Sequence, residues 1–257
     1  MQPKPHQLHP TLQTILCIAA HPDDIEFGEA GTVAKWAREG RAVIFCLVTN
    51  GAAGTNAHTS TNENLVTIRE KECWDSAQIL GVKHIEFLHY QDGIVEPTLA
   101  LRRDLTRVIR KHKPDVALCG DPTTRMYGTG YLNHPDHRAV ASAALDAIFP
   151  SAETRYIFPE LLAEGLEPHK VKELFIGFGE PDTWIDIGDT IDLKCQALKA
   201  HASQIGKGEW IDKRMREWAA SDYKKTGIKY SEGYKRMVFW EPPKNTTAKK
   251  PRTRRKK

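Results

Sequence analysis

The distribution of apolar and polar positions predicts strands that alternate with helices. Helical spacing is clearest at 64–80, where Cys73, Ala77 and Leu80 fall four and three residues apart and Gly81 is placed to end the helix. Short apolar runs of the length of a buried strand lie on either side of such segments. In the first half of the chain these runs are residues 14–20, 42–49, 84–88 and 115–119.

A strand followed by a helix, repeated four times, favours an α/β fold: a doubly wound, Rossmann-like and mostly parallel sheet with helices on both faces. A helix at 97–112 is expected to begin with Pro97 in its first turn. We expect an amphipathic helix at 189–204, which Asp189 could cap. Later strands are expected at 171–178, 183–187 and 236–240. No linker divides the chain, so the pattern predicts a single domain.

Composition and charge separate a mildly acidic body from a basic tail. The chain has 257 residues, of which 40% are hydrophobic, enough for one substantial core. Its net charge of +4 arises because residues 244–257 hold eight of the 37 Lys and Arg and no acid. Such a tail cannot form a core and is expected to be disordered. We therefore divide the chain into an extension at 1–13, a domain at 14–243 and a tail at 244–257, and expect no nucleic-acid partner.

Neither a membrane span nor a secretory leader is expected from the sequence. No apolar run approaches the roughly 18 residues that a membrane span needs, and residues 1–13 lack the apolar core of a signal peptide. The five cysteines include no CxxC pair, which favours reduced thiols. These observations predict a soluble, cytoplasmic protein.

Two polar motifs follow strands of the expected sheet. HPDD at 21–24 comes directly after the first apolar run, and HPDH at 134–137 lies in the segment after the fourth. In doubly wound sheets ligands bind beyond the carboxyl ends of the strands, so both motifs open onto the same edge. Six candidate donors converge there: His21, Asp23, Asp24, His134, Asp136 and His137.

The pairing of these motifs favours a metal site. A single His-Pro-Asp is more often a turn in which the aspartate caps a helix, but two such motifs at one functional edge are not expected by chance. Two histidines and one carboxylate bind a metal and leave an open position for water. His21 and Asp24, three residues apart, can reach one metal, and Asp23 would then face its water.

The quoted motifs resemble those of a known enzyme family. "AAHPDDIEFGEAGT" and "NHPDHRA" are similar to the signatures of the zinc-dependent PIG-L or LmbE-like de-N-acetylases, which act on N-acetylglucosaminyl-phosphatidylinositol and in the mycothiol and bacillithiol pathways. The likeness includes "IREKECWDSAQILGV", "FLHYQDG" and "WIDIGDTIDLKCQALKAHASQ", and so covers most of 14–205. It implies a metal-dependent hydrolase that removes the N-acetyl group from an N-acetylglucosamine-type sugar or glycoconjugate.

The resemblance also implies a role for individual residues. The implied metal ligands are His21, Asp24 and His137. Asp23 is implied as the general base, and His134, oriented by Asp136, as the group that polarises the carbonyl or protonates the leaving amine. Arg69 is implied to contact substrate. The implied metal is Zn²⁺, although nitrogen and oxygen donors also accept Fe²⁺.

The loop at 120–133 departs from the shorter members of the family because it is longer and more aromatic. Tyr131 could cover the apolar side of a sugar ring, and Arg125 could meet a charged substituent, so both are predicted to bind substrate. A second departure lies at 49–54, where this chain has TNGAAG. Many members of the family have a Thr-x-Gly-Glu sequence there, with an acidic residue that this chain lacks. The loss of that contact is expected to affect which substrate is accepted.

Three other functions remain open from the sequence. Two histidines and a carboxylate also form the iron triad of non-haem oxygenases. A hydrolase of this kind could act on a non-sugar amide. A protein without catalytic activity could bind nucleic acid through the basic tail. The favoured hydrolase is expected to act on a small-molecule substrate and to form a homo-oligomer.

Overall fold

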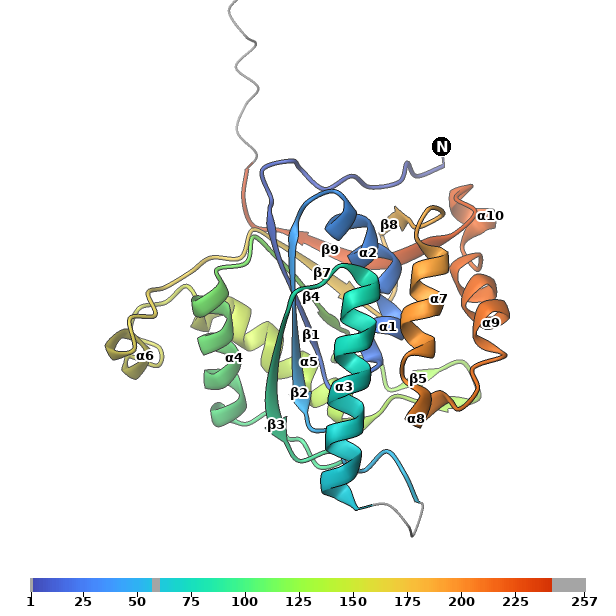
Figure 1. The fold of residues 1–257 in the computed structure, drawn as a ribbon. Helices are drawn as coiled ribbons and strands as arrows, with labels where there is room; N and C mark the ends of the chain where they lie inside the picture. Colours follow the sequence, from blue (N-terminus) through green and yellow to red (C-terminus); the bar gives the residue numbers. More distant parts are fainter. Residues whose placement is uncertain (1, 57–60, 242–257) are drawn as a thin grey trace, which may run out of the picture.

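The computed structural model describes residues 2–56 and 61–241. In this part of the chain a seven-stranded sheet forms the centre of the fold (Figure 1). Its strand order is β3-β2-β1-β4-β7-β9-β8. The first five of these are parallel neighbours, and β9 runs antiparallel between β7 and β8. The strands are β1 (Thr14–Ala19), β2 (Ala42–Thr49), β3 (His84–Tyr90), β4 (Val116–Gly120), β7 (Glu173–Gly177), β8 (Thr183–Asp186) and β9 (Ser231–Val238). This topology confirms the predicted, mostly parallel α/β fold.

Helices cover both faces of the sheet (Figure 1). They are α1 (Asp24–Gly28), α2 (Ala30–Arg38), α3 (Asn62–Leu80), α4 (Leu99–His112), α5 (Pro135–Asp146), the irregular turn η1 (Ala147–Ser151), α6 (Glu160–Ala163), α7 (Ile191–Lys199), α8 (Ala202–Ile205), α9 (Ile211–Ala219) and α10 (Tyr223–Thr226). On one face α7 packs against α1, α2, α3 and α9, while α4, α5 and η1 pack together on the other. Along β1, Ile15 and Cys17 enter the first core and Leu16 and Ile18 the second, as the strand's period of two requires.

Several predicted boundaries are wrong. Pro97 precedes α4, because the hydroxyl of Thr98 accepts a hydrogen bond from the N–H of Leu101 at 3.2 Å and so makes Thr98 the cap. The helix expected at 189–204 is two helices, α7 and α8, that meet around His201, and Asp189 does not cap the first. Strand β9 begins at residue 231, earlier than the expected 236.

The N-terminal extension and the loop at 120–133 contain structure that the sequence analysis did not specify. Leu8 and Leu12 of the N-terminal extension are buried in the first core. The loop contains a hairpin of two short strands, β5 (Met126–Tyr127) and β6 (Tyr131–Leu132). The tail at 244–257 lies outside the described residues. All five cysteines are buried and free, and no described helix has the length and hydropathy needed to cross a membrane.

Arg110 of α4 fixes the chain that follows η1. Its side chain is fully buried, and its guanidinium donates to the carbonyl oxygens of Ser151, Ala152, Thr154 and Ile157 at 2.8–3.2 Å. Because Arg110→Ala would leave these buried acceptors without donors, we expect the free energy of unfolding in urea to fall by about 3 kcal/mol or more.

Arg107, on the same helix, supplies the matched control. It pairs with Glu164 at 2.8 Å, but 34% of its side chain is exposed. Arg107→Ala should therefore cost less than about 1 kcal/mol. Equal destabilisation by the two variants would show that the buried carbonyl contacts of Arg110 contribute nothing specific.

Candidate functional site

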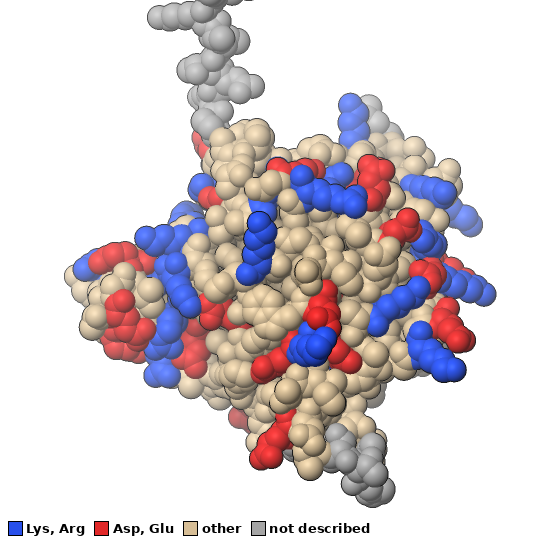
Figure 2. Space-filling model, in the orientation of Figure 1, with Lys and Arg blue, Asp and Glu red and all other residues tan. Residues whose placement is uncertain are grey.

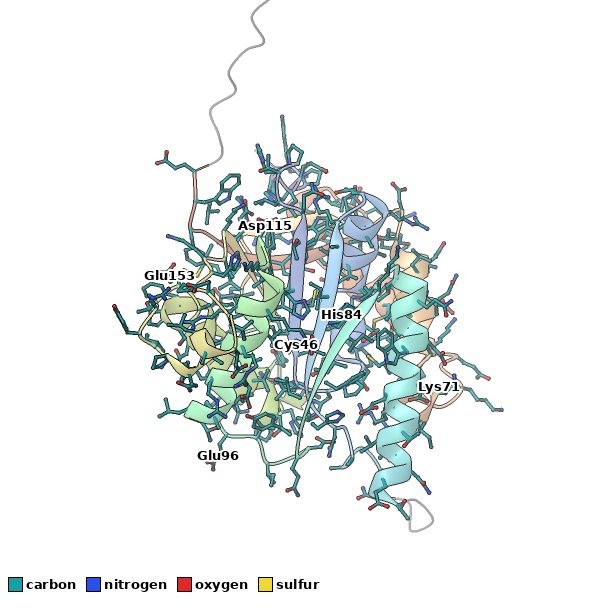
Figure 3. The ribbon with its side chains drawn as sticks, turned by 60° about the vertical axis from the view of Figure 1, so that its left-hand side comes forward. Cys46, Lys71, His84, Glu96, Asp115 and Glu153 are labelled. Carbon is teal, nitrogen blue, oxygen red and sulfur yellow. The ribbon has the colours of Figure 1, made fainter. Side chains whose placement is uncertain are left out.

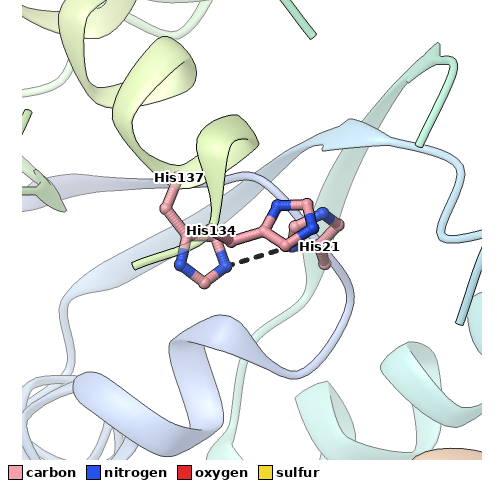
Figure 4. Close-up of side chains that lie close together, drawn as sticks. All are labelled: His21, His134 and His137. Atoms are coloured by element: carbon pink, nitrogen blue, oxygen red, sulfur yellow. Dashed lines mark hydrogen bonds between the residues drawn. The ribbon is translucent and has the colours of Figure 1, made fainter. Parts of the chain in front are cut away.

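Three side chains meet at the carboxyl edge of the sheet. His21 follows β1, Asp24 opens α1, and His137 lies in the first turn of α5. Nδ1 of His21 is 3.2 Å from Nε2 of His137, a contact drawn in Figure 4, and 3.3 Å from Oδ2 of Asp24. Nε2 of His137 is 3.0 Å from Oδ1 of Asp24. The two predicted motifs therefore come together although they are distant in the sequence.

The distances within this triad fit a metal-binding group. Four ligands around zinc, at the usual bond lengths, are separated by roughly 3.3 Å, close to the observed spacings. The remaining ring nitrogens also have acceptors: Nε2 of His21 lies 3.0 Å from Asp92 Oδ1, and Nδ1 of His137 lies 3.0 Å from Asn133 Oδ1. Such partners fix the tautomer of a ligating histidine, so that its unprotonated nitrogen faces the metal.

The charge around His21 also favours a cation. Burial opposes protonation of its imidazole, but the carboxylates of Asp24, Asp136 and Asp92 raise its pKa to about 12. A buried group of three carboxylates is costly unless a proton or a metal ion offsets their charge.

Sequence reasoning missed Asp92 and Asn133. Asp92 follows β3 at the same edge of the sheet, and its Oδ2 accepts from the N–H of Ala53 at 2.9 Å. Asn133 is four residues before His137 and immediately before the HPDH motif. The sequence could have indicated Asp92 because it follows a strand, and Asn133 because it precedes the HPDH motif. Their contacts with histidine rings, however, can be identified only in the folded structure.

Asp23 lies beside the triad, in a backbone conformation with φ 104° that residues other than glycine seldom adopt. Burial, and then the charge of Asp24, raise the pKa of Asp23 to about 7. Its Oδ2 accepts from Nη2 of Arg69 at 3.3 Å. The other contacts of that guanidinium are the carbonyl oxygens of Pro22 and Gly51, and only 4% of the Arg69 side chain is exposed. Arg69 thus supports the loop that carries Asp23, and its contact with substrate stays a prediction.

His134 lies next to the triad and is the N-cap of α5. Its ring is 4.8 Å from that of His21, measured between centroids (Figure 4). Nδ1 accepts from the backbone N–H of Asp136 at 3.2 Å, whereas the Asp136 carboxylate is 4.0 Å from Nδ1. That carboxylate instead accepts from the N–H groups of Gly93 and Val95. The closer contact between His134 and Asp136 is therefore with the backbone of Asp136, and the role of its side chain in orienting His134 stays a prediction.

The hairpin β5–β6 brings Tyr131 near the triad and leaves Arg125 at the surface. Tyr131 is 57% exposed, and after burial the charges of Asp24 and Asp23 contribute to raising the pKa of its hydroxyl. Arg125 is exposed, and its carbonyl accepts from the N–H of Asn133 at 2.9 Å. Among the described contacts, none joins the Arg125 side chain to the triad.

His201 contacts Glu26 on α1, the helix that begins with Asp24, and this contact was not predicted from the sequence. It is fully buried, with Nε2 3.3 Å from Oε1 of Glu26 on α1. The same oxygen accepts from the hydroxyl of Ser76 on α3 at 2.5 Å. Glu26 lies two residues after Asp24 on α1. Its contacts with Ser76 and His201 therefore connect the helix that begins at Asp24 to α3 and to the start of α8.

Comparison with known proteins identifies related sequences. Residues 16–148 match the family described as PIG-L, GlcNAc-PI de-N-acetylase. Diacetylchitobiose deacetylase of Thermococcus kodakarensis is 32% identical over 225 residues, which cover 86% of this chain and 82% of that protein. A probable N-acetyl-alpha-D-glucosaminyl L-malate deacetylase 2 of Bacillus anthracis is 28% identical over 196 residues, covering 74% and 81%.

Solved structures agree with the sequence matches. N,N'-diacetylchitobiose deacetylase from Pyrococcus horikoshii superposes with a TM-score of 0.82 at 31% identity, over 89% of this chain and 85% of that one. The 4-carboxy-2-hydroxymuconate hydratase GalB from Pseudomonas putida has a TM-score of 0.74 at 21% identity, covers 91% and 99%, and shows the fold alone. With over half of its length matched and its HPDD and HPDH motifs joined at one edge of the sheet, this chain belongs to the GlcNAc-PI de-N-acetylase (PIG-L) family.

Proposed function

We propose that this chain is a zinc-dependent hydrolase that removes the acetyl group from the 2-acetamido position of a short N-acetylglucosamine oligosaccharide. The family supports the reaction, and two relatives named diacetylchitobiose deacetylases support the substrate. The observation that carries the proposal is the meeting of His21, Asp24 and His137, with Asp23 beside them.

The proposed metal ligands are His21, Asp24 and His137. A divalent ion held by them would polarise the acetamide carbonyl and lower the pKa of a bound water from about 15.7 to about 7. Two imidazoles and a carboxylate suit zinc, and also accept Fe²⁺.

Asp23 is proposed to move the proton, and His134 to stabilise the developing negative charge. A carboxylate of Asp23 would accept the proton of the attacking water, since it lies beside the triad and is largely shielded from solvent. Burial and the nearby His21 lower the pKa of His134, so its ring is neutral, and with Nδ1 accepting from the backbone the proton is on Nε2. Nε2–H can then donate a hydrogen bond to the carbonyl oxygen as negative charge develops, and the proton that Asp23 accepts from the water would pass to the leaving amine.

The surface charge supports a small-molecule substrate over nucleic acid. On the face shown in Figure 2, Lys and Arg are interspersed with Asp and Glu and do not gather into one basic groove. The family match also favours hydrolysis over the oxygenase and the binding protein that the sequence left open.

The exposed hairpin should affect substrate binding more than turnover. Tyr131→Ala is expected to raise KM by roughly 3–10-fold with little change in kcat, since an aromatic contact is worth about 0.5–1.5 kcal/mol. Met126→Ala is the matched control, because Met126 is 67% exposed on the paired strand. Unchanged kinetics in both Tyr131→Ala and Arg125→Ala would remove this loop from the pocket.

The buried contact behind the site should affect turnover. His201→Ala removes one of the two partners of the buried Glu26 carboxylate and leaves only the Ser76 hydroxyl, so kcat should fall by roughly 10–100-fold, as for outer residues around a metal site. Ser203→Ala, on the short helix that His201 caps, removes only an exposed hydroxyl contact with Glu72 and should have no effect on kcat. Wild-type kcat in His201→Ala would show that the contact with Glu26 only fills space.

The deciding experiment is acetate release from a panel of N-acetylglucosamine conjugates by zinc-loaded protein. Diacetylchitobiose, N-acetylglucosaminyl malate and an N-acetylglucosaminyl inositol should be compared, with the Asp23→Asn variant as the control. Release by the wild type alone, fastest on diacetylchitobiose, is expected. If no acetate is released from any conjugate, the proposal of a sugar substrate is wrong. Faster release from the malate conjugate would indicate a substrate with an acidic aglycone instead of an oligosaccharide.

A further inference from the structure

A second cluster of metal-type donors lies at the opposite end of the strands from the candidate catalytic site. His84 is the first residue of the edge strand β3 (Figure 3), and His112 is the last residue of α4. Nε2 of His84 is 2.9 Å, and Nε2 of His112 is 2.7 Å, from Oε1 of Glu86. The three donor atoms lie within 4.8 Å of one another.

The fold holds this cluster at two fixed points. His84 and Glu86 are two residues apart on one strand and so project from the same face. His112 joins them from the final turn of α4, and its ring centroid is 4.8 Å from that of His84. The side chains are 48% (His84), 21% (Glu86) and 13% (His112) exposed, so the cluster is open to solvent mainly at His84.

The charges leave the donors suited to a metal ion. Burial opposes ionisation of Glu86, but hydrogen bonds from His84, Lys111 and His112 hold its pKa at about 2. Burial is the main cause that lowers the pKa of His112, so its imidazole is neutral at neutral pH, and binding of a metal ion at Nε2 would move the ring proton from Nε2 to Nδ1. Nζ of Lys111, 2.6 Å from Oε1 of Glu86, supplies the positive charge that a metal ion would displace.

We propose that His84, Glu86 and His112 form a second, solvent-open site for a divalent transition-metal ion such as Zn²⁺. Two imidazoles and one carboxylate select zinc, copper or nickel over magnesium and calcium. The two observed N···O distances are shorter than the roughly 3.3 Å between ligands of zinc, and the exposed His84 ring is free to move outward to that spacing. A bound ion would join the end of α4 to the edge strand and stabilise the folded state.

Calorimetric titration of the chelator-treated full chain with Zn²⁺ tests this inference. The titration is done in a His137→Ala background, which removes a proposed ligand of the catalytic site. One equivalent should bind there, and adding His112→Ala or His84→Ala should weaken it by roughly 10–100-fold or more, since even an outer partner of a metal ligand is worth that much. Lys111→Ala should tighten binding, because it removes the competing cation.

A matched control is His89→Ala, an exposed histidine on the same strand that pairs with Glu70 and should not change the titration. No zinc binding in the His137→Ala protein, or undiminished binding after both His84→Ala and His112→Ala, would overturn the inference. Its failure is distinct from failure of the proposed function: a wild-type equivalent that is lost in His84→Ala but kept in His137→Ala would reject the catalytic ligands and leave the second site standing. Acetate release by His112→Ala should equal that of the wild type.

Discussion

Asp23→Asn should lower kcat for acetate release by roughly 10²–10⁴-fold while the protein keeps its full metal content. The amide cannot accept the proton of the attacking water, whereas the proposed ligands His21, Asp24 and His137 are untouched. Asn can still accept the hydrogen bond that Arg69 donates to Asp23 at 3.3 Å. The measurement pairs steady-state kinetics with metal analysis of the same sample.

Asparagine is the suitable replacement because of the backbone. Asp23 has φ 104°, and Asp and Asn are the residues besides glycine that best tolerate positive φ. Alanine would combine the loss of the carboxylate with backbone strain and so confuse the two effects. Asp75→Asn, the same change at a half-exposed surface position, should behave as wild type. If Asp23→Asn loses metal together with activity, the roles of Asp23 and Asp24 have been assigned the wrong way round.

The fold was predictable because its strands are short apolar runs and its helices have a regular spacing. What could not be predicted were element ends that depend on one side chain. The cap of α4 is the Thr98 hydroxyl, one residue beyond Pro97, which sequence alone favoured. The long helix expected at 189–204 is interrupted because His201 turns inward to Glu26 on another helix.

The site was predictable only where its residues form a motif next to a strand. Asp92 was missed because its link to the site is a contact with His21, which is distant in the sequence. In the fold, Oδ1 of Asp92 is 3.0 Å from Nε2 of His21. Arg69 was expected to contact substrate, and its ion pair with Asp23, which is distant in the sequence, appears only in the folded structure. Hydrogen bonds across the sheet edge leave no periodic trace in a sequence.

His137→Ala should lose the metal ion of the catalytic site and, with it, nearly all acetate release. Only His21 and Asp24 would remain of the three proposed ligands, and two ligands do not hold zinc against dilution or a chelator. Asn133→Ala, which removes the acceptor 3.0 Å from Nδ1 of His137, should weaken metal binding by roughly 10–100-fold and lower activity accordingly. In a His112→Ala background, which removes a proposed ligand of the second site, metal affinity measured by competition with a chromogenic chelator should therefore fall in the order unchanged catalytic site, Asn133→Ala, His137→Ala.

His134→Ala is the variant that makes this series decisive. Donor atoms of His21, His134 and His137 lie within 4.8 Å of one another, so three histidines are a geometric alternative to the set that contains Asp24. We expect His134→Ala to keep wild-type metal affinity and to lower kcat by roughly 10²–10³-fold, as for the loss of one oxyanion donor. Metal loss equal to that of His137→Ala would instead make His134 a ligand. Asp24→Asn would then retain the metal, and the hydrogen bond to the carbonyl oxygen that is assigned to His134 would need another donor.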